Sequence, residues 1–539
     1  MGLHILPSMS APAVVEVARP DSAGHEAAPF DGLGRAAVVA GAVVVLAAGL
    51  VLRFWSRSHL WLDEALTVNI ARLPLRQLPR ALRHDGAPPL YYVVLHLWMR
   101  LFGTSTAAVR ALSGVLAVIT LPLVWRAGRR LGADEDAALV GGVAVLLLAS
   151  SPFAIRYATE ARMYSLVALL TVLGYLALAR VLERDRPTPL DIGAVGLVSG
   201  LLLLSHYWSL YLLATVAGAL LIKGRRGGAA TRRQVTAACA GLALGFVLFL
   251  PWLPSLVFQL RHTGTPWAVP ASFSAMVNAI GEFAGGRSSS GRALGLLFFA
   301  LAGFGLFGAA VDGHRVEIDL RTRPRARGMA VTVAGTLAIA IGIGFATRGA
   351  FAARYAAVVF VPFLLLVAAG TVVFVDRRVL AGVIAAAVAF GLVTSTGNVT
   401  TDRTQAGQLA RELRSQLRPG DVVGYCPDQL APAESRLLPR NVTQVTFPRY
   451  AGPSFVDWVD YGATVRASDP SAFARFLDRQ AGPGHTVWMI WASLYRTLGT
   501  DCEQINAQLS ALRPQTNQLI EADTQHFFEH ANLVRYLPR

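Results

Sequence analysis

The chain has 539 residues, of which 54% are hydrophobic and 15% are charged, whereas soluble proteins carry about 25% charged residues. Apolar runs long enough to cross a bilayer recur through the first 400 residues, which excludes an ordinary soluble protein and predicts a polytopic membrane protein. The net charge is +16, but residues 400–539 contain 14 Arg against 14 Asp and Glu. The basic excess therefore belongs to residues 1–399, which argues against a basic tail for nucleic acid and fits membrane topology with an anionic substrate.

Residues 1–35 mix proline, alanine, glycine and charged residues without periodicity, which predicts a disordered cytoplasmic tail. Residues 36–399 hold about eleven apolar segments, which predict a helical membrane domain. With a cytoplasmic N-terminus, most arginines of the short loops fall inside, and the odd number of spans places residues 400–539 outside the cytoplasm. The expected spans lie near residues 36–53, 106–126, 137–152, 163–181, 190–205, 207–222, 233–253, 291–311, 329–347, 356–375 and 379–396.

The first outside loop, residues 54–105, is too patterned for a simple connector. Its stretch "HLWLDEALTVNIA" (59–71) places two adjacent carboxylates, Asp63 and Glu64, before apolar residues at helical spacing. Arginines on the opposite faces predict two helices that lie in the membrane interface. Because carboxylates also stabilise a helix N-terminus, the acid pair is either a helix start or part of a functional site.

The same loop continues as "HDGAPPLYYVVLHLW", in which His84 and Asp85 precede two prolines that force an extended backbone. Tyr91 follows among aromatic residues that suit the boundary between lipid and water. The pattern leaves open whether these three side chains are structural or line a site.

Three further outside segments carry groups that suit phosphate or sugar chemistry. In "SPFAIRYATEARMYSL" (151–166) they are close together, which indicates either a polar cap on a turn or a binding site. A histidine near the interface is often structural, and an arginine at the end of a span often reaches for the headgroups, so both readings stay open for the other two segments. The groups are Glu160, Arg162 and Tyr164; His206 and Tyr207 in "LLLLSHYWSLYLL"; and Arg354 and Tyr355 in "RYAAVVFVPFLLLVAAG".

In order along the chain, "WLDEA", "DGAPPLYYVVLHLW", "SPFAIRYATEARMYSL", "LLLLSHYWSLYLL" and "RYAAVVFVPFLLLVAAG" resemble the C-type (GT-C) glycosyltransferases. The resemblance is to the protein-O-mannosyltransferase and aminoarabinose-transferase kind and covers roughly residues 36–375. Members transfer a sugar from a polyprenyl-phosphate carrier to an acceptor on the outer face of the membrane. The resemblance implies an all-α polytopic membrane protein with the GT-C fold, to which residues 400–539 add a separate domain.

Chemistry explains the residue types. A polyprenyl phosphate leaves as an anion that needs charge stabilisation, and the arginine fork matches phosphate oxygens. The acceptor hydroxyl or amine needs a carboxylate base at the attack face, so one base with arginine clamps predicts single displacement with inversion. Adjacent residues of a helix point about 100° apart, so Asp63 and Glu64 cannot serve equally. The resemblance gives the base role to the first acid of such a pair.

The resemblance therefore implies that Asp63 is the base and Glu160 a second catalytic acid, with Arg162, Arg354 and Tyr164 at the donor phosphate. The expected lining of the substrate cavity is Glu64, His84, Asp85, Tyr91, His206, Tyr207 and Tyr355. Some related enzymes bind a metal through the second acid. No Asp and His cluster in this chain has metal-ligand spacing, so neither a metal nor a cofactor is expected.

Residues 400–539 change character. "RPGDVVGYCP" and "GHTVWMIWASL" have the pattern of buried strands, and "SAFARFLDRQ" has the pattern of an amphipathic helix. We expect a small α/β domain outside the cytoplasm. There Cys426 and Cys502 are able to form a disulfide, although the sequence does not show that they lie close together.

The sequence thus predicts an integral-membrane inverting glycosyltransferase of a bacterial plasma membrane. It would move mannose or an arabinose-like sugar from a polyprenyl-phosphate donor to an envelope glycan, glycolipid or protein, in contact with membrane lipid and without nucleic acid. A nucleotide-sugar donor would need a nucleotide-binding domain, and no stretch has that fingerprint. The alternative is a transporter or flippase for lipid-linked sugars. It is disfavoured because the ionisable groups cluster at the outer ends of the spans, whereas transport sites lie near the midplane.

Overall fold

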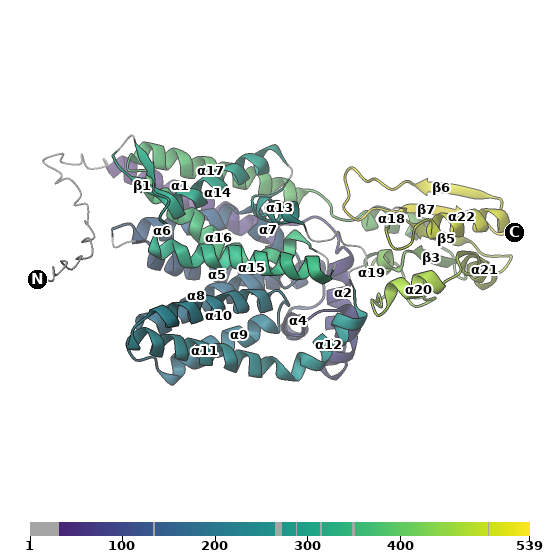
Figure 1. The fold of residues 1–539 in the computed structure, drawn as a ribbon. Coiled ribbons are helices and arrows are strands. Elements are labelled where there is room, and N and C mark those ends of the chain that lie inside the picture. Colours follow the sequence, from purple (N-terminus) through teal and green to yellow (C-terminus); the bar gives the residue numbers. More distant parts are fainter. Residues whose placement is uncertain are drawn as a thin grey trace, which may run out of the picture. The chain divides into compact units, whose positions relative to one another are not determined.

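The computed structural model describes residues 32–132, 135–264, 272–286, 288–312, 315–347, 351–493 and 495–539 (Figure 1). The chain divides into two units, Met1–Val44 and Val45–Arg539. Helix α1 (Gly32–Phe54) begins in the first unit and ends in the second. The predicted disordered tail, residues 1–35, falls almost wholly outside the described residues.

From Val45 to Thr400 the second unit consists almost entirely of helices (Figure 1). Three short helices, α2 (Leu62–Ala71), α3 (Leu78–Asp85) and α4 (Leu90–Phe102), fill the first predicted outside loop. The helices that follow are α5 (Thr106–Leu131), α6 (Ala137–Ser150), α7 (Pro152–Ala158), α8 (Tyr164–Glu183), α9 (Pro189–Leu203), α10 (Ser209–Arg226), α11 (Ala229–Phe249), α12 (Leu253–His262), α13 (Phe273–Phe283), α14 (Ser289–Phe307), α15 (Pro324–Thr347), α16 (Ala357–Gly370) and α17 (Arg377–Thr400). A two-stranded hairpin, β1 (Gly308–Ala310) with β2 (Val316–Ile318), lies between α14 and α15.

Among the described residues, eight helical segments are long and apolar enough to cross a membrane. The bent pair of α6 and α7, with 55° between the two helices, makes a ninth candidate. All eleven predicted spans fall on helices; the two others are α9, with 15 residues, and α10, whose last turn carries three basic residues. The prediction of a helical polytopic membrane protein is confirmed.

Helix α16 is apolar on every side, and each of its 14 residues is buried. A helix of this kind belongs in the interior of a bundle, and α16 packs against α6, α8, α14 and α15. It follows directly on the short 3-10 turn Ala353–Ala356, which carries Arg354. The most deeply buried helix therefore fixes the backbone position of that arginine.

The first loop follows the amphipathic expectation only in part. In α3, Leu78 and Leu82 are buried while Arg80 and Arg83 are exposed, as in an interfacial helix. In α2, most residues are buried, because the helix contacts both α4 and the short helix α19 (Ala431–Ser435). The helix that carries Asp63 is thus enclosed by protein.

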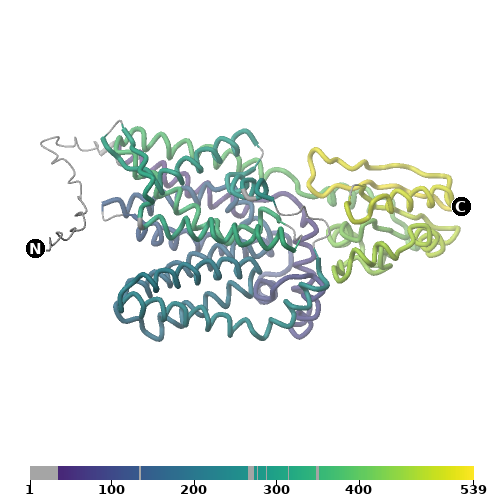
Figure 2. The backbone as a smooth tube through the Cα atoms, in the orientation of Figure 1, coloured from purple at the N-terminus to yellow at the C-terminus, as the bar shows by residue number. Residues whose placement is uncertain are grey.

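The chain after Thr400 forms a five-stranded mixed sheet, whose backbone Figure 2 traces in yellow-green and yellow. The strand order is β4-β3-β5-β7-β6; β3 pairs in parallel with β4 and β5, and β7 pairs antiparallel with β5 and β6. Helices cover both faces, so the predicted buried strands and amphipathic helix are confirmed as β3, β5 and α21. The elements are α18 (Ala406–Gln416), β3 (Val422–Cys426), α19, β4 (Thr443–Thr446), α20 (Tyr461–Ala467), α21 (Pro470–Ala481), β5 (Val487–Trp491), α22 (Asp501–Leu512), β6 (Thr516–Ile520) and β7 (Asn532–Tyr536).

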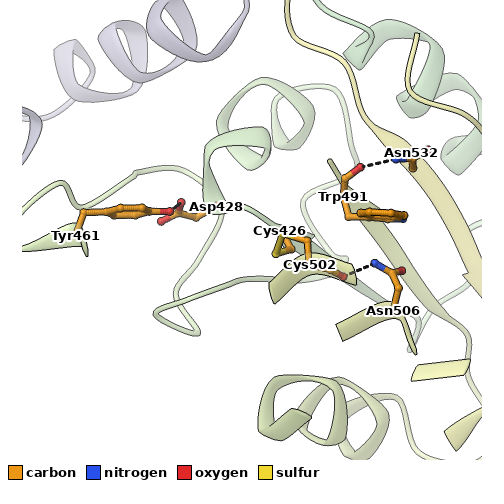
Figure 3. Close-up of a disulfide and its surroundings, with 7 residues drawn as sticks. All are labelled: Cys426, Asp428, Tyr461, Trp491, Cys502, Asn506 and Asn532. Atoms are coloured by element: carbon orange, nitrogen blue, oxygen red, sulfur yellow. Dashed lines mark hydrogen bonds between the residues drawn. A yellow bond between two sulfur atoms is a disulfide. The ribbon is translucent and has the colours of Figure 1, made fainter. Parts of the chain in front are cut away.

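A disulfide joins Cys426, at the end of β3, to Cys502, in the first turn of α22, with Cα atoms 5.5 Å apart (Figure 3). This pairing settles the question that the sequence left open. Two residues beyond Cys426, the buried carboxyl of Asp428 accepts a 2.7 Å hydrogen bond from the Tyr461 hydroxyl (Figure 3). Burial raises the pKa of Asp428 to about 7, against the opposing effects of this hydrogen bond and of Arg449.

Gly370 tests the packing of the bundle. A Cβ at this position would lie 1.8 Å from the carbonyl oxygen of Leu301 in α14, a backbone atom that cannot turn away. We expect Gly370→Ala to force α14 and α16 apart and to destabilise the protein by about 1–3 kcal/mol or more. The measurement is the unfolding temperature of the detergent-solubilised chain. Gly303→Ala, in α14 with open space around its Cβ, is the matched control, and equal unfolding temperatures would contradict the packing.

Asp428 makes the stability of the sheet region depend on pH. Between the ordinary pKa of 3.8 and the folded value of about 7, the folded state keeps a proton that the unfolded chain has released. The stabilisation is therefore complete below pH 3.8 and is lost as the pH rises through 7. Asp428→Asn should remove this pH dependence, which amounts to at most about 4 kcal/mol in the free energy of unfolding. The unfolding temperature across pH 4–8 measures it, with the exposed Glu521→Gln as control. An unchanged slope in Asp428→Asn would count against it.

Candidate active site

Asp63 lies in the first turn of α2, and its carboxylate faces two arginines from distant parts of the chain. Asp63 Oδ2 is 3.7 Å from Nη2 of Arg162 and 3.7 Å from Nη2 of Arg354. Both distances exceed a hydrogen bond, and the three side chains keep 19%, 14% and 21% of their surface exposed, respectively. The carboxylate and the two guanidinium groups lie close together and remain partly exposed, so a ligand is able to reach them.

Arg162 comes from the loop between α7 and α8 and is held by α2. Its Nη1 donates a 2.9 Å hydrogen bond to Thr67 Oγ1, and the Thr67 hydroxyl donates a 2.7 Å bond to the carbonyl of Asp63. Burial by itself would lower the pKa of Arg162, but the Asp63 carboxylate and other neighbours raise it well above the ordinary value. The guanidinium therefore stays charged in its buried position.

Arg354 lies against aromatic rings. The centre of its guanidinium is 5.9 Å from the ring centroid of Trp61 and 5.7 Å from that of Tyr355, within the range of cation–π attraction. Trp61 and Tyr355 form an aromatic wall beside Arg354. The ring of Tyr164 continues this wall toward Tyr157, and the centroids of the two tyrosine rings are 4.5 Å apart. Within the described part of the chain, the buried hydroxyl of Tyr164 has no hydrogen-bond partner.

His206 closes the wall between Tyr164 and Tyr355, with ring centroids 5.9 and 5.7 Å away. Burial, and then the charges of Arg162 and Arg354, lower the pKa of His206 to about 3, so the imidazole is neutral. The backbone N–H of Trp208 lies 3.2 Å from Nδ1 and donates to it, which places the ring proton on Nε2. A neutral histidine here can donate a hydrogen bond without adding positive charge.

Glu64, adjacent to Asp63, has a different environment. It is fully buried and accepts two hydrogen bonds from Arg110, at 2.8 and 2.6 Å, and a third from the backbone N–H of Ala161 at 2.8 Å. Burial is the largest single effect and raises the pKa of Glu64, but the charge and hydrogen bonds of Arg110, together with Arg403 and the N–H of Ala161, lower it overall. Glu64 thus ties α2 to α5 and to the second loop, and it has no open side facing Arg162 and Arg354.

Glu160 is also buried, and its described partner is Trp61, whose indole N–H donates a 2.8 Å hydrogen bond to Oε1. Because Trp61 lies beside Arg354, Glu160 positions the aromatic wall. The Oε2 atom is buried and has no partner among the described residues.

The sheet region reaches the same site. The side chain of Glu529 accepts a 3.1 Å hydrogen bond from the backbone N–H of Leu62, at the start of α2. The ring of Phe528 packs edge-on against Trp61 with centroids 5.4 Å apart. Burial raises the pKa of Glu529 to about 8. Residues 528 and 529 thus complete the surroundings of Asp63 from a part of the chain more than 460 positions away.

Arg403, at the start of the sheet region, holds the two loops together. Its backbone N–H donates to Ser58 Oγ at 2.8 Å, and its guanidinium donates to the carbonyl and the hydroxyl of Thr159 at 3.0 and 2.7 Å. A cavity of about 350 Å³ opens beside it, with Asn398, Asp402 and Phe528 in its wall. Loop, bundle and sheet region meet here.

Four predicted cavity residues lie outside the group around Asp63. His84 Nδ1 lies 2.9 Å from a carboxylate oxygen of Asp457, at the edge of the sheet region. The Tyr91 hydroxyl is buried against Ser113 Oγ at 2.9 Å. Tyr207 donates to Gln259, which in turn binds the first loop through the carbonyl of Leu82.

Asp85 is the fourth and lies nearer to the centre. It accepts a 2.7 Å hydrogen bond from the Tyr92 hydroxyl. Burial raises its pKa, and Arg162 acts in the opposite direction, which places Asp85 within electrostatic range of the site. Among the described residues no group of three or more His, Cys, Asp or Glu side chains has the geometry of a metal site.

Several residues that build the site had no motif to reveal them. Trp61 lies inside "WLDEA" and Thr67 follows in the same helical stretch, but the pattern does not predict that either side chain lies beside an arginine. Arg110, Arg403 and Glu529 stand in stretches without a recognisable pattern. Their roles depend on contacts between segments far apart in the chain.

The comparisons with known proteins agree with this fold. Residues 86–254 match the family described as dolichyl-phosphate-mannose-protein mannosyltransferase. No curated protein matches the chain.

Among solved structures, ArnT from Cupriavidus metallidurans in the apo state superposes with a TM-score of 0.57 at 14% identity, over 93% of this chain and 98% of ArnT. The same protein bound to undecaprenyl phosphate gives 0.53 at 15% identity, over 94% and 98%. The archaeal oligosaccharyltransferase AglB from Archaeoglobus fulgidus, in complex with an inhibitory peptide and a dolichol-phosphate, gives 0.51 at 11% identity, over 91% and 74%. The expected fold is thus confirmed: the chain has the GT-C fold that ArnT and AglB share.

Proposed function

We propose that the chain is an inverting membrane glycosyltransferase that moves a sugar from a polyprenyl-phosphate donor to an acceptor of the cell envelope. The observation that carries the proposal is the carboxylate of Asp63 between the guanidinium groups of Arg162 and Arg354, at 3.7 Å from each. Two similar structures add support: ArnT is bound to undecaprenyl phosphate, and AglB is in complex with a dolichol-phosphate.

The proposed reaction is one displacement. An acceptor oxygen or nitrogen forms a bond to the anomeric carbon, and its proton passes to the Asp63 carboxylate. The bond from the anomeric carbon to the phosphate oxygen breaks, and its electron pair stays on the polyprenyl phosphate. The guanidinium groups of Arg162 and Arg354 stabilise that anion. Because a single base serves the attack face, the configuration at the anomeric carbon inverts.

The long contacts to Asp63 favour this assignment. At 3.7 Å both contacts are longer than a hydrogen bond, so the arginines hold the Asp63 carboxylate by charge. Among the described residues, the buried Nε–H of Arg162 has no hydrogen-bond partner. A donor phosphate would accept from this N–H and leave the Asp63 oxygens for the proton of the acceptor. The Tyr164 hydroxyl, buried beside this wall, is the proposed third contact to the phosphate. His206 and Tyr355 would line the sugar side of the cavity.

The sheet region is proposed to lie outside the cytoplasm of a bacterial plasma membrane and to contribute to the acceptor side. The cavity of about 350 Å³ next to Arg403 carries serine, asparagine and histidine side chains, which suit the hydroxyl groups of a glycan. The disulfide between Cys426 and Cys502 supports this location, because disulfides persist in oxidising compartments. Mannose or an arabinose-like sugar remains the proposed sugar of the polyprenyl-phosphate donor.

The two adjacent acids make a matched test. Asp63→Asn should lower the transfer rate by about 10²–10⁴-fold, because it removes the base. The unfolding temperature should stay close to that of the wild type, because Asp63 makes only long, partly exposed ion pairs. The assay is transfer by the purified full chain in liposomes, with radiolabelled polyprenyl-phosphate sugars and an envelope extract as acceptor.

Glu64→Gln is the control, with the opposite profile. It leaves the buried Arg110 without its counter-charge, which should destabilise the fold by about 3–5 kcal/mol. Full transfer activity in Asp63→Asn would contradict the proposal that Asp63 is the base. Transport of labelled lipid into liposomes without any transfer would favour the flippase.

The arginine contacts predict a second result. Arg162→Gln and Arg354→Gln should each weaken binding of undecaprenyl phosphate by about tenfold or more, because each removes a charged donor to phosphate. Binding is measured as stabilisation of the purified chain by added undecaprenyl phosphate. Arg261→Gln, an exposed arginine at the end of α12, should bind like the wild type. Unchanged binding in both site variants would contradict the proposed phosphate contacts.

A further inference from the structure

A large cavity among the described residues lies at the end of the bundle opposite Asp63. It has a volume of about 930 Å³ and is bounded by the ends of α5 and α8 and the start of α9. Arg110, in the second turn of α5, contacts Glu64, whereas Arg126 and Arg129 of the cavity come four to five turns later. At 1.5 Å of rise per residue they lie about 24 and 28 Å further along the helix, close to the thickness of a bilayer core.

The lining changes along its depth. At the end of the bundle it carries the arginines Arg126, Arg129, Arg130 and Arg180, and toward the membrane interior it carries apolar side chains such as Leu173 and Val198. In α8 the step from Leu173 to Arg180 covers seven residues, or about 10 Å. A charged mouth above an apolar wall matches a lipid, with its phosphate at the arginines and an acyl chain along the helices.

The charges at the mouth are only partly compensated. The carboxylate in the wall, Asp191, is already bound by Arg180 at 3.0 Å and by Arg184 at 2.6 Å. Arg130 forms a 3.3 Å pair with Glu183, and both side chains are exposed. Arg129 lies 4.8 Å from the ring centroid of Trp125. Within the described ranges, neither Arg126 nor Arg129 has a hydrogen bond or ion pair, so both guanidinium groups are available to an anion.

We propose that this cavity binds an anionic phospholipid from the membrane leaflet opposite Asp63. Arg126 and Arg129 bind the phosphate diester, and one acyl chain lies between α5, α8 and α9. The lipid joins three helices whose other ends carry Glu64's partner Arg110, the loop of Arg162, and the segment before His206. The site is distinct from the proposed donor site, and binding here does not depend on the transfer reaction.

The test uses the delipidated full chain in detergent. Added phosphatidylglycerol should raise the unfolding temperature by about 2–5 °C, whereas phosphatidylcholine and inorganic phosphate should not. The double variant Arg126→Gln/Arg129→Gln should lose this shift while unfolding at the wild-type temperature without lipid. The matched control is Arg225→Gln/Arg226→Gln at the end of α10, outside the cavity lining, which should keep the shift.

A second variant tests the apolar part. Ala194→Trp fills the wall of the cavity and leaves the arginines in place, so it should also remove phosphatidylglycerol that native mass spectrometry detects on the wild type. The proposal is overturned by an equal shift with phosphatidylcholine, by a full shift in both cavity variants, or by a shift with undecaprenyl phosphate alone. Loss of the shift in both cavity variants, with the control unaffected, supports it.

Discussion

One buried ion pair, between Glu64 and Arg110, supports the rest of the site. Taking two charges out of water is costly, and the cost is offset here because both carboxylate oxygens and the guanidinium are fully hydrogen-bonded. The pair joins α2 to α5, and the backbone N–H of Ala161 joins the second loop to the same carboxylate. Asp63 and Arg162 are the direct chain neighbours of Glu64 and Ala161. Their separation is therefore set by an interaction in which neither takes part.

This arrangement divides the work between two adjacent acids. Glu64, whose oxygens are all hydrogen-bonded, has no acceptor capacity left for a ligand. Asp63, which is held only by long ion pairs, keeps that capacity. The same contrast holds for the arginines, because Arg110 is enclosed while Arg162 and Arg354 stay partly exposed. The rigid pair of Glu64 and Arg110 thus fixes the position of the neighbouring charges, while Asp63, Arg162 and Arg354 remain able to interact with a ligand.

The sequence predicted the parts of the molecule that depend on local pattern. Apolar runs located the spans, buried-strand patterns located β3 and β5, and quoted motifs led to Asp63, Arg162 and Arg354. It did not predict that α2 would be enclosed, because the covering helix α19 lies in another part of the chain. It also did not reveal that His84, Tyr91 and Tyr207 contact Asp457, Ser113 and Gln259, because a sequence pattern does not show where a side chain points. Arg403 and Glu529 act through contacts across hundreds of residues, for which a single sequence carries no pattern.

The hydrogen bond from the backbone of Leu62 to Glu529 has a consequence for biosynthesis. A chain leaves the ribosome from its N-terminal end, so the bundle inserts into the membrane while the segment around Glu529 does not yet exist. Until that segment is made and the sheet has assembled, the first turn of α2 lacks this partner and Trp61 lacks its cover. The nascent bundle thus carries Asp63, Arg162 and Arg354 before Phe528 and Glu529 exist to complete their surroundings.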